Sequence, residues 1–365
     1  MNSSDVIVVG GGINGMMSAL KLIQQGFRVT LVERGRCARE ASWAGGGILI
    51  PLYPWRYSEP IAHLDALAAP QWCELADRLA ETTGIDPQYT AHGIMHVRVE
   101  DAERARAWSV YHQNMLVPLS SPQAHQKLGA EVTPSLDPAF WLPGRGSIRT
   151  PRLGKALRQW LLNHPHATLL EHFEVTSLLT TKGRVEGVTG PQGRQLAPRV
   201  VVAGGPWTGQ LMARHVTLPI KPVRGQMLLF RPGRALLKLV VLMKGFYLIP
   251  RRDHHILAGS TFEDVGFDRT TTREGHARIH AQALAMLPAL GEADITHHWA
   301  GLRPSSPDSV PLVGAVDDIE GLYVNAGHGG NGVVLSPATA DLLCAHITGT
   351  PPPIASAPYE IPRSG

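Results

Sequence analysis

The first thirty-three residues contain a short apolar strand, a glycine-rich turn, a helical segment and a second apolar strand, in that order. Residues 5–9 read Asp-Val-Ile-Val-Val, and residues 10–15 read Gly-Gly-Gly-Ile-Asn-Gly. A helical pattern follows over 16–25, and an apolar run over 28–32 ends in Glu33. This is a G-x-G-x-x-G turn between a strand and a helix, with an acidic residue at the end of the next strand. The chain is therefore predicted to begin with a βαβ unit that binds a dinucleotide.

Each glycine of this turn has its own physical role. Gly10 permits the tight turn, Gly12 lets the backbone approach a pyrophosphate, and Gly15 lets the helix pack against the strand. The N-terminus of the helix offers unpaired N–H groups to phosphate oxygens. A carboxylate at Glu33 can accept hydrogen bonds from ribose hydroxyls. The alternative is a glycine-rich turn in an ordinary βαβ unit. Such a unit would not need the glycines, the helix start and the acidic residue at these particular spacings.

Composition bounds the class of protein. A chain of 365 residues with 44% apolar and 18% charged residues is typical of one large or two smaller globular domains. The net charge is +4 and the longest basic run is Arg251-Arg252, so no nucleic-acid partner is predicted. Three cysteines without a C-x-x-C pair favour a reducing compartment. No leader precedes the first strand and no apolar run is long enough for a membrane span, so a cytoplasmic location is expected.

Strand-to-glycine patterns recur later in the chain. The run 200–207 repeats the pattern of the opening, and a strand at 321–324 leads into a glycine cluster at 327–332. Between them, residues 220–258 are typical of antiparallel strands. The prediction is an α/β fold in which a discontinuous Rossmann-like domain (1–88, 148–219 and 305–350) accompanies a second α+β domain built on an antiparallel sheet (89–147 and 220–304). Helices are expected at 61–82, 101–114, 150–163, 272–287 and 336–347, and a loose Pro-rich tail at 351–365.

Four segments of this chain resemble the D-amino-acid oxidase superfamily of FAD-dependent enzymes, and in particular its glycine oxidase branch. They are the turn at 10–15, Ser42-Trp43-Ala44-Gly45-Gly46-Gly47, Gly301-Leu302-Arg303-Pro304 and Gly327-His328-Gly329-Gly330-Asn331-Gly332. The stretch 51–57 resembles bacterial glycine oxidases. The resemblance covers nearly the whole chain. It implies non-covalent FAD bound to the Rossmann-like domain, and a homo-oligomer that is a tetramer.

The resemblance also implies the residues of the site. Arg303 matches the arginine that pairs with the substrate carboxylate, Tyr247 matches a tyrosine whose hydroxyl joins that carboxylate, and Phe262 falls at a pocket-lining position. Cofactor contacts are implied for Gly10, Gly12, Ile13, Asn14, Gly15, Glu33, Arg34, Ser42, Trp43, Ala44, Gly45, Gly46, Val175, Ala203, Gly204, Trp207, Arg303, His328, Gly329, Gly330, Asn331, Gly332 and Val333. Two positions depart from the branch: Gly329-Gly330 stands where many glycine oxidases have aromatic-Arg, and Phe262 stands where one bacterial branch has methionine.

The implied function is oxidative deamination of a small amino acid, foremost glycine, with sarcosine and small D-amino acids as further substrates. The products would be an imine or glyoxylate, ammonia and hydrogen peroxide, and the imine would supply thiamine thiazole synthesis. Because the flavin takes the hydride, the protein needs only to fix the carboxylate and aim the Cα atom. A guanidinium does this with two parallel hydrogen bonds.

Several other functions remain open at this point. One is a dehydrogenase for D-proline-like amino acids that passes electrons to an acceptor other than oxygen. The others are an FAD-binding scaffold without turnover and an NAD-dependent dehydrogenase. No metal site is predicted, because the adjacent histidines of 254–255 and 297–298 would point to opposite faces of a strand. Cys344 lies in an apolar helix and is interpreted as a buried thiol. Trp55 and Tyr57 are assigned either to the active-site entrance or to a subunit contact.

Overall fold

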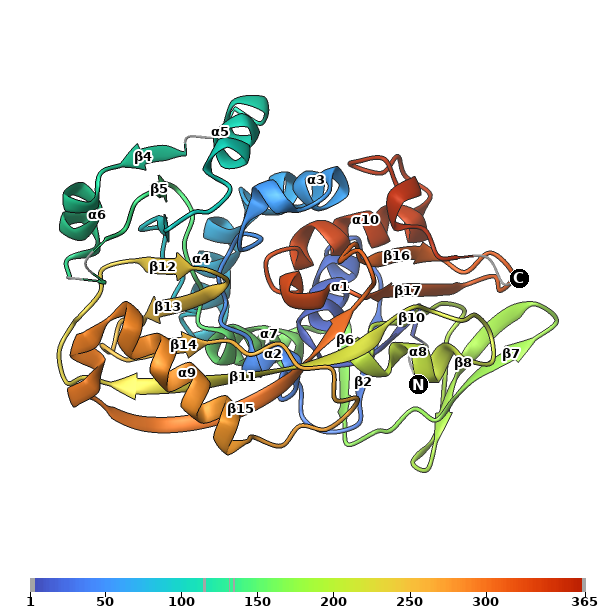
Figure 1. Cartoon of the computed structure of the whole chain (residues 1–365). Coiled ribbons are helices and arrows are strands. Elements are labelled where there is room, and N and C mark those ends of the chain that lie inside the picture. The colour runs from blue at the N-terminus through green and yellow to red at the C-terminus, as the bar shows by residue number, and fades with distance from the viewer. Residues whose placement is uncertain (1–3, 114–115, 131, 134, 363–365) are drawn as a thin grey trace.

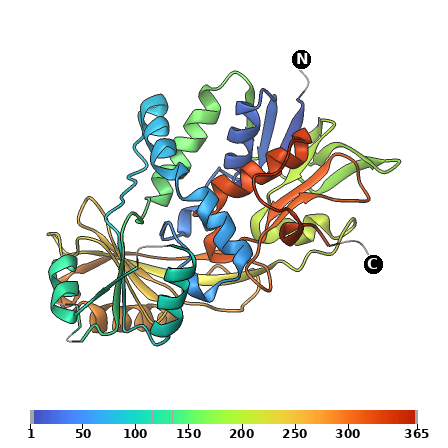
Figure 2. The same cartoon turned by 90° about the horizontal axis from the view of Figure 1, so that it is seen from above.

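A computed structural model describes residues 4–113, 116–130, 132–133 and 135–362. Its architecture is mixed α/β, as predicted, with one six-stranded sheet, one eight-stranded sheet and a small three-stranded sheet. The two large sheets lie on opposite sides of the molecule, and helices pack around both (Figures 1 and 2). Residues 1–3, 114–115, 131, 134 and 363–365, which the predicted ranges also include, lie outside the described residues.

The six-stranded sheet contains the predicted βαβ unit. Its strand order is β16 (Leu312–Ala315), β17 (Leu322–Ala326), β10 (Val200–Val202), β1 (Val6–Val9), β2 (Val29–Glu33) and β6 (Ala167–Glu171). Every neighbouring pair is parallel except β16 with β17. The segments that follow β1, β10 and β17 therefore all leave the sheet at one edge, where ligands of such sheets bind.

Two layers cover the faces of this sheet, and alternate residues of β1 point into each of them. Val6 and Val8 join a core with α1 (Ile13–Gln24), α7 (Thr150–Asn163) and α10 (Ser336–Thr348). Ile7 and Val9 join a second core on the other face. That face is covered by α8 (Thr208–Met212) and by the small sheet of β7 (Ser177–Thr181), β8 (Arg184–Gly190) and β9 (Gly193–Leu196). Burial on both faces explains the continuous apolar run.

The eight-stranded sheet is antiparallel except at one pair, β12 with β3. Its order is β15 (Asp294–Ser305), β11 (Lys221–Arg231), β14 (Ile256–Gly259), β13 (Phe246–Pro250), β12 (Val240–Met243), β3 (Ile94–Val97), β5 (Ala139–Leu142) and β4 (Val117–Leu119). Helices α6 (Ser121–Leu128) and α9 (Arg273–Met286) share one core with this sheet, and residues from 48–55 share the core on its other face.

The remaining elements are short or differ from the sequence-based expectation. The helix expected over 61–82 is two helices, α3 (Glu59–Ala68) and α4 (Gln71–Thr83), because Pro70 has no backbone N–H to continue the first. The helix expected over 101–114 is α5 (Ala102–Tyr111). Helix α2 (Ala41–Ala44) follows β2. Single 3-10 turns lie at Pro54–Arg56, Gly205–Trp207, Pro288–Glu292, Gly329–Asn331 and Ala357–Tyr359.

The Pro-rich segment after α10 was predicted to be loose, but the structure shows that it packs on the body of the protein. Tyr359 is fully buried, and its hydroxyl donates to the carbonyl of Pro60 at 2.8 Å. Ile361 is buried as well, so two apolar anchors hold the segment on the body of the protein. Composition alone misled here, because a few buried side chains suffice to order a proline-rich chain whose backbone is already stiff.

The two large sheets take their strands from different stretches of the chain. The six-stranded sheet uses 6–33, 167–202 and 312–326, and the eight-stranded sheet uses 94–142 and 221–305. The domain boundaries inferred from the sequence remain an interpretation of this alternation. In the part of the chain that the structure describes, no helix is both long and apolar enough to cross a membrane.

Candidate active site

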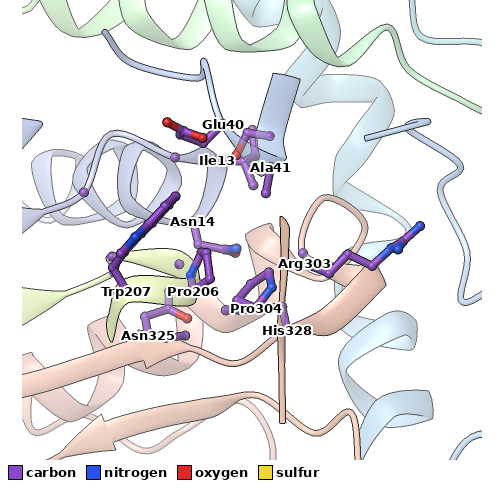
Figure 3. A pocket seen from close by; sticks show the side chains of 18 of the residues that line it. Ile13, Asn14, Glu40, Ala41, Pro206, Trp207, Arg303, Pro304, Asn325 and His328 are labelled. Carbon is purple, nitrogen blue, oxygen red and sulfur yellow. Dashed lines mark hydrogen bonds between the residues drawn. The ribbon is translucent and has the colours of Figure 1, made fainter. Parts of the chain in front are cut away.

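A cavity of about 400 Å³ lies where the carboxyl edge of the six-stranded sheet meets one face of the eight-stranded sheet. Figure 3 shows Trp207 and Arg303 on opposite sides of it, with Asn14, Pro206 and His328 between them. A volume of this size is typical of a cofactor or substrate site. The cavity brings together segments that are far apart in the sequence, including the turn after β1, residues 40–46, residues 173–176 and the glycine cluster after β17.

The turn at 10–15 requires glycine for reasons visible in the protein itself. Gly10 has a φ of +112°, and a Cβ there would lie 2.4 Å from the carbonyl oxygen of Ala203. A Cβ on Gly15 would lie 1.9 Å from the carbonyl oxygen of Gly10. Gly15 therefore packs the helix onto the turn and does not itself line the cavity. Gly10, Gly12, Ile13 and Asn14 do line it, at the open N-terminus of α1.

Glu33 holds the same turn from the neighbouring strand. One of its carboxylate oxygens accepts from the N–H of Gly11 at 2.7 Å, and the other accepts from the N–H of Gly35 at 2.9 Å. A carboxylate oxygen has further lone pairs, so ribose hydroxyls can still donate to Glu33, which lines the cavity. Gly11 was not singled out from the sequence. The structure shows that it too must be glycine, because a Cβ there would lie 2.5 Å from the Cys37 sulfur. The available signal was the run of three glycines at 10–12, because the G-x-G pattern requires only the first and the last of them.

Residues 42–46 are tied to α1, to α7 and to the residue that follows β13. Ser42 Oγ accepts from the N–H of Ile13 at 2.7 Å, so its hydroxyl caps the first turn of α1. The Thr150 hydroxyl donates to the carbonyl of Gly45 at 2.7 Å, and Arg251 donates to the carbonyl of Gly46 at the same distance. These bonds position a backbone segment between the phosphate end and the substrate end of the cavity.

Two buried amide oxygens in this region have no hydrogen-bond partner among the described residues. They are Oδ1 of Asn14 and Oδ1 of Asn325, and both residues line the cavity. A buried polar atom without a partner is costly in the free energy of folding, so a polar ligand is expected to meet these groups. The glycine turn, the acid on β2 and these open amides together fit an elongated FAD.

Arg303, on β15, lines the end of the cavity opposite Trp207. Its guanidinium donates to Ser260 Oγ at 2.6 Å and to the carbonyl of Thr261 at 3.2 Å. It lies over Gly225 of β11, where a Cβ would come within 2.3 Å of the guanidinium. Gly225 is therefore a site residue that sequence analysis missed, since only the strand pairing reveals the contact. Arg303 keeps N–H groups for a bidentate bond to a carboxylate.

Tyr247 of β13 stands beside this arginine. The tyrosine is 5% exposed and lines the cavity, and a Cβ on Gly46 would lie 3.5 Å from its hydroxyl. Burial raises the pKa of Tyr247 above its usual value, so the hydroxyl stays protonated at neutral pH. A protonated phenol can donate to the same carboxylate that Arg303 binds.

Four other predicted residues lie outside the cavity wall. Trp43 packs its ring edge against Trp299 at 5.5 Å between centroids, and the carbonyl of Ala44 accepts from the Trp299 indole at 3.1 Å. Asn331, within the glycine cluster at 327–332, is buried. Phe262 is 72% exposed, with the Arg303 guanidinium carbon 5.6 Å from its ring centroid. The other predicted residues, apart from Gly15, line the cavity: Gly10, Gly12, Ile13, Asn14, Glu33, Arg34, Ser42, Gly45, Gly46, Val175, Ala203, Gly204, Trp207, Tyr247, Arg303, His328, Gly329, Gly330, Gly332 and Val333.

The titratable groups near the glycine cluster do not suggest further catalytic chemistry. Burial lowers the pKa of His328 to about 3, so its imidazole is neutral at ordinary pH. Its Nε2 lies 3.3 Å from Thr339 Oγ1. Burial also raises the pKa of the Cys344 thiol to about 12. No group of three or more potential metal-ligating side chains occurs within the described ranges.

Residues from the segment after β14 contact two side chains of the cavity wall, Trp207 and Glu40. Arg34 lies over the Trp207 ring at 3.7 Å from its centroid, and Phe267 packs against the same ring at 5.7 Å. Glu40, which also lines the cavity, accepts from Arg269 at 2.6 Å. Phe267 and Arg269 were not singled out from the sequence. Phe267 contacts Trp207 and Arg269 pairs with Glu40, so each holds a side chain of the cavity wall.

Arg269→Ala should raise the Kd for FAD by about two- to fivefold and leave the KM for substrate unchanged. The pair with Glu40 is exposed, and such pairs contribute at most about 1 kcal/mol. Fluorescence titration of apoprotein with FAD measures the change. Arg184→Ala, which breaks the exposed pair with Glu320 far from the cavity, serves as control. Equal Kd values for the three proteins would remove Arg269 from the cofactor site.

Comparisons with known proteins agree with this geometry. A family model described as "FAD dependent oxidoreductase" matches residues 5–346. A glycine oxidase of Pseudomonas putida is 40% identical over 98% of both chains. The crystal structure of glycine oxidase from Geobacillus kaustophilus superposes with a TM-score of 0.93 over 100% of both chains, at 28% identity. A bifunctional protein ThiO/ThiG of Synechocystis sp. is 31% identical over 93% of this chain and 51% of its own length.

Proposed function

Because this chain belongs to the family of FAD-dependent oxidoreductases, we propose that it is an amino-acid oxidase that acts on glycine. Glycine, O2 and water would yield glyoxylate, ammonia and hydrogen peroxide. The proposal includes sarcosine and small D-amino acids as further substrates. Likeness over the full length to a glycine oxidase at 40% identity supports the choice of substrate.

The observation that carries the proposal is Arg303 beside Tyr247 in the wall of a cavity suited to FAD. A cofactor scaffold without turnover has no need of a free guanidinium and a buried phenol at the end of its cavity. The pair suits a carboxylate, because a planar guanidinium gives two parallel bonds and the phenol a third. Arg303 is held from behind by Ser260 and Thr261, so its orientation is set before the substrate arrives.

In the reaction, bound FAD supplies the acceptor for the hydride that leaves the Cα atom. Arg303 and Tyr247 would hold the carboxylate and thereby aim the Cα atom. The carbonyl of Gly46 is fixed by Arg251, which keeps the segment next to Tyr247 in place. The eight-stranded sheet contributes Met227 and Tyr247 to this end of the wall, which limits the access of water. No side chain needs to form a covalent bond with the substrate.

Phe262 as a determinant of substrate size remains a prediction. Its exposed ring lies outside the cavity wall, near the guanidinium of Arg303. If the ring closes the pocket once substrate is bound, then Phe262→Ala should widen the range toward larger D-amino acids.

The experiment that tests the function is peroxide release by the purified protein with glycine, sarcosine, D-alanine, D-proline and D-phenylalanine. We expect glycine and sarcosine to give the highest kcat/KM and D-phenylalanine the lowest. Turnover with an artificial acceptor but without peroxide would instead favour the dehydrogenase, the alternative that has less support. A preference for D-phenylalanine would exclude glycine as the main substrate.

Tyr247→Phe should lower kcat/KM for glycine by about tenfold, which corresponds to about 1.4 kcal/mol, a typical value for one hydrogen bond to a charged group. The loss is moderate because Arg303 still holds the carboxylate. Tyr111→Phe, at an exposed tyrosine of α5 that does not line the cavity, makes the same chemical change and is the control. Steady-state kinetics at saturating FAD measures the effect. An unchanged kcat/KM would mean that the hydroxyl does not contact the substrate.

The wider setting is proposed from the resemblance. The protein would be cytoplasmic and would assemble as a homo-oligomer, a tetramer as in its family. It would supply glycine imine for thiamine thiazole synthesis, which the likeness to a ThiO/ThiG protein supports.

A further inference from the structure

A second cavity, of about 170 Å³, lies at the N-terminal ends of β3 and β12 and takes in the basic pair of the sequence, Arg251-Arg252. Hydroxyls of Thr90 and Ser147 are part of its wall. No acidic side chain stands among the described residues that line it. Its basic lining residues are His92, Lys238, Arg251, Arg252 and His254.

The charges in this cavity are incompletely balanced. Arg252 pairs with Asp86 at 2.7 Å. Within the described ranges, neither Lys238 nor Arg251 forms an ion pair. Burial, followed by the charge of Arg149, lowers the pKa of Arg251 to about 10. Arg251 remains a cation at neutral pH, with a charge that nearby carboxylates offset only in part. Lys238 and Arg251 both line this small cavity without an ion pair among the described residues, and such a local excess of positive charge favours an anion there.

We propose that this cavity binds a phosphate-sized oxyanion, either inorganic phosphate or the phosphate group of an ester. Lysine serves as a point charge for such a group, and the guanidinium adds directed N–H donors. The Thr90 hydroxyl donates to the carbonyl of Ser147 at 3.2 Å, so the Ser147 hydroxyl is the one further donor that this pair can offer at the same wall. The volume leaves room for one phosphate group and excludes a nucleotide.

Arg251 connects this cavity to the wall of the candidate active site. Its guanidinium donates to the carbonyl of Gly46 at 2.7 Å and to the carbonyl of Ile148 at 3.3 Å. A Cβ on Gly46 would lie 3.3 Å from the Tyr247 ring, so Gly46 and Tyr247 are in contact. An anion bound to Arg251 is therefore separated from the substrate end of the active-site cavity by Gly46. The anion and the substrate carboxylate would bind different arginines, Arg251 and Arg303. Phosphate in this cavity should bind together with the substrate and not in competition with it.

The test is calorimetric titration of the FAD-loaded protein with sodium phosphate, with chloride keeping the ionic strength constant. We expect Lys238→Gln to weaken phosphate binding by about tenfold, the effect of losing one charge-assisted contact. Lys244→Gln is the matched control, because Lys244 is an exposed lysine just beyond the other end of β12, paired with Glu100. Arg303→Ala should bind phosphate as the wild type does, which separates this cavity from the carboxylate site.

A parallel titration with glycerol phosphate distinguishes the two sources. Equal affinity for both compounds would mean that the phosphate group alone is recognised, and tighter binding of the ester would identify an ester as the ligand. The proposal is overturned if the wild type binds neither compound, if Lys238→Gln binds phosphate unchanged, or if binding disappears in Arg303→Ala. Because Lys238 is exposed, its substitution should leave Tm and the flavin spectrum unchanged.

Discussion

Arg303→Ala should leave a folded, yellow protein whose kcat/KM for glycine is lower by about a hundredfold or more. Losing a bidentate, charge-assisted pair with a carboxylate costs roughly 3 kcal/mol or more in the transition state. The protein itself loses the bonds to Ser260 and Thr261 and the contact with the Phe262 ring, so the fold should survive. Peroxide production over a range of glycine concentrations, together with the flavin absorbance spectrum, measures both properties.

Arg231→Ala is the control for this variant. Arg231 lies at the end of β11 and pairs only at the surface with Asp294, at 3.0 Å. Its replacement should leave kcat/KM within about twofold of the wild type. Near-normal turnover in a folded Arg303→Ala protein would remove Arg303 from the substrate site and with it the observation on which the proposed function rests.

Gly12→Ala should yield a folded protein that binds FAD about ten- to a hundredfold more weakly. The backbone of Gly12, with φ of −72° and ψ of 178°, is open to alanine, and the nearest atom to its Cβ would be Ser42 Oγ at 3.4 Å. The added methyl group therefore meets no hard obstacle within the protein. It would instead project where the pyrophosphate approaches α1, and overpacking of this kind costs about 1–3 kcal/mol.

Two glycine variants make this result interpretable. Gly209→Ala lies in α8 with nothing closer than 3.5 Å to its Cβ, so its Kd for FAD should equal that of the wild type. Gly15→Ala meets the carbonyl of Gly10 at 1.9 Å and should lose thermal stability even without cofactor. Fluorescence titration and thermal unfolding of the apoproteins separate the two effects. Full FAD affinity in Gly12→Ala would place the pyrophosphate elsewhere.

The parts of the site that could be predicted from the residues alone are those whose members lie close together in the sequence. The turn at 10–15 and Glu33 lie within one βαβ unit, whose register is set by a strand, a helix and the next strand, and the structure shows them in contact. The α/β class followed from the same periodicities, and the structure confirms it. Arg303 and Tyr247 were named only through resemblance, since an arginine and a tyrosine on separate strands carry no local signal.

The parts that sequence analysis missed depend on contacts between distant segments. Gly225 became part of the site because β11 pairs with β15, which places it beneath the Arg303 guanidinium. Tertiary packing brings Ser42 of α2 to the first N–H of α1. Arg251 reaches Gly46 across 205 residues of sequence. Such pairings follow from strand register and packing, which periodicity alone does not specify.

The most direct measurement of the central claim is the flavin absorbance of the purified protein when glycine is added without oxygen, followed by admission of air. We predict that glycine bleaches the oxidised flavin spectrum, and that air restores it with one hydrogen peroxide and one glyoxylate formed per flavin. A flavin that stays oxidised with glycine would contradict glycine as the substrate. A flavin that glycine reduces but air does not reoxidise would contradict the oxidase.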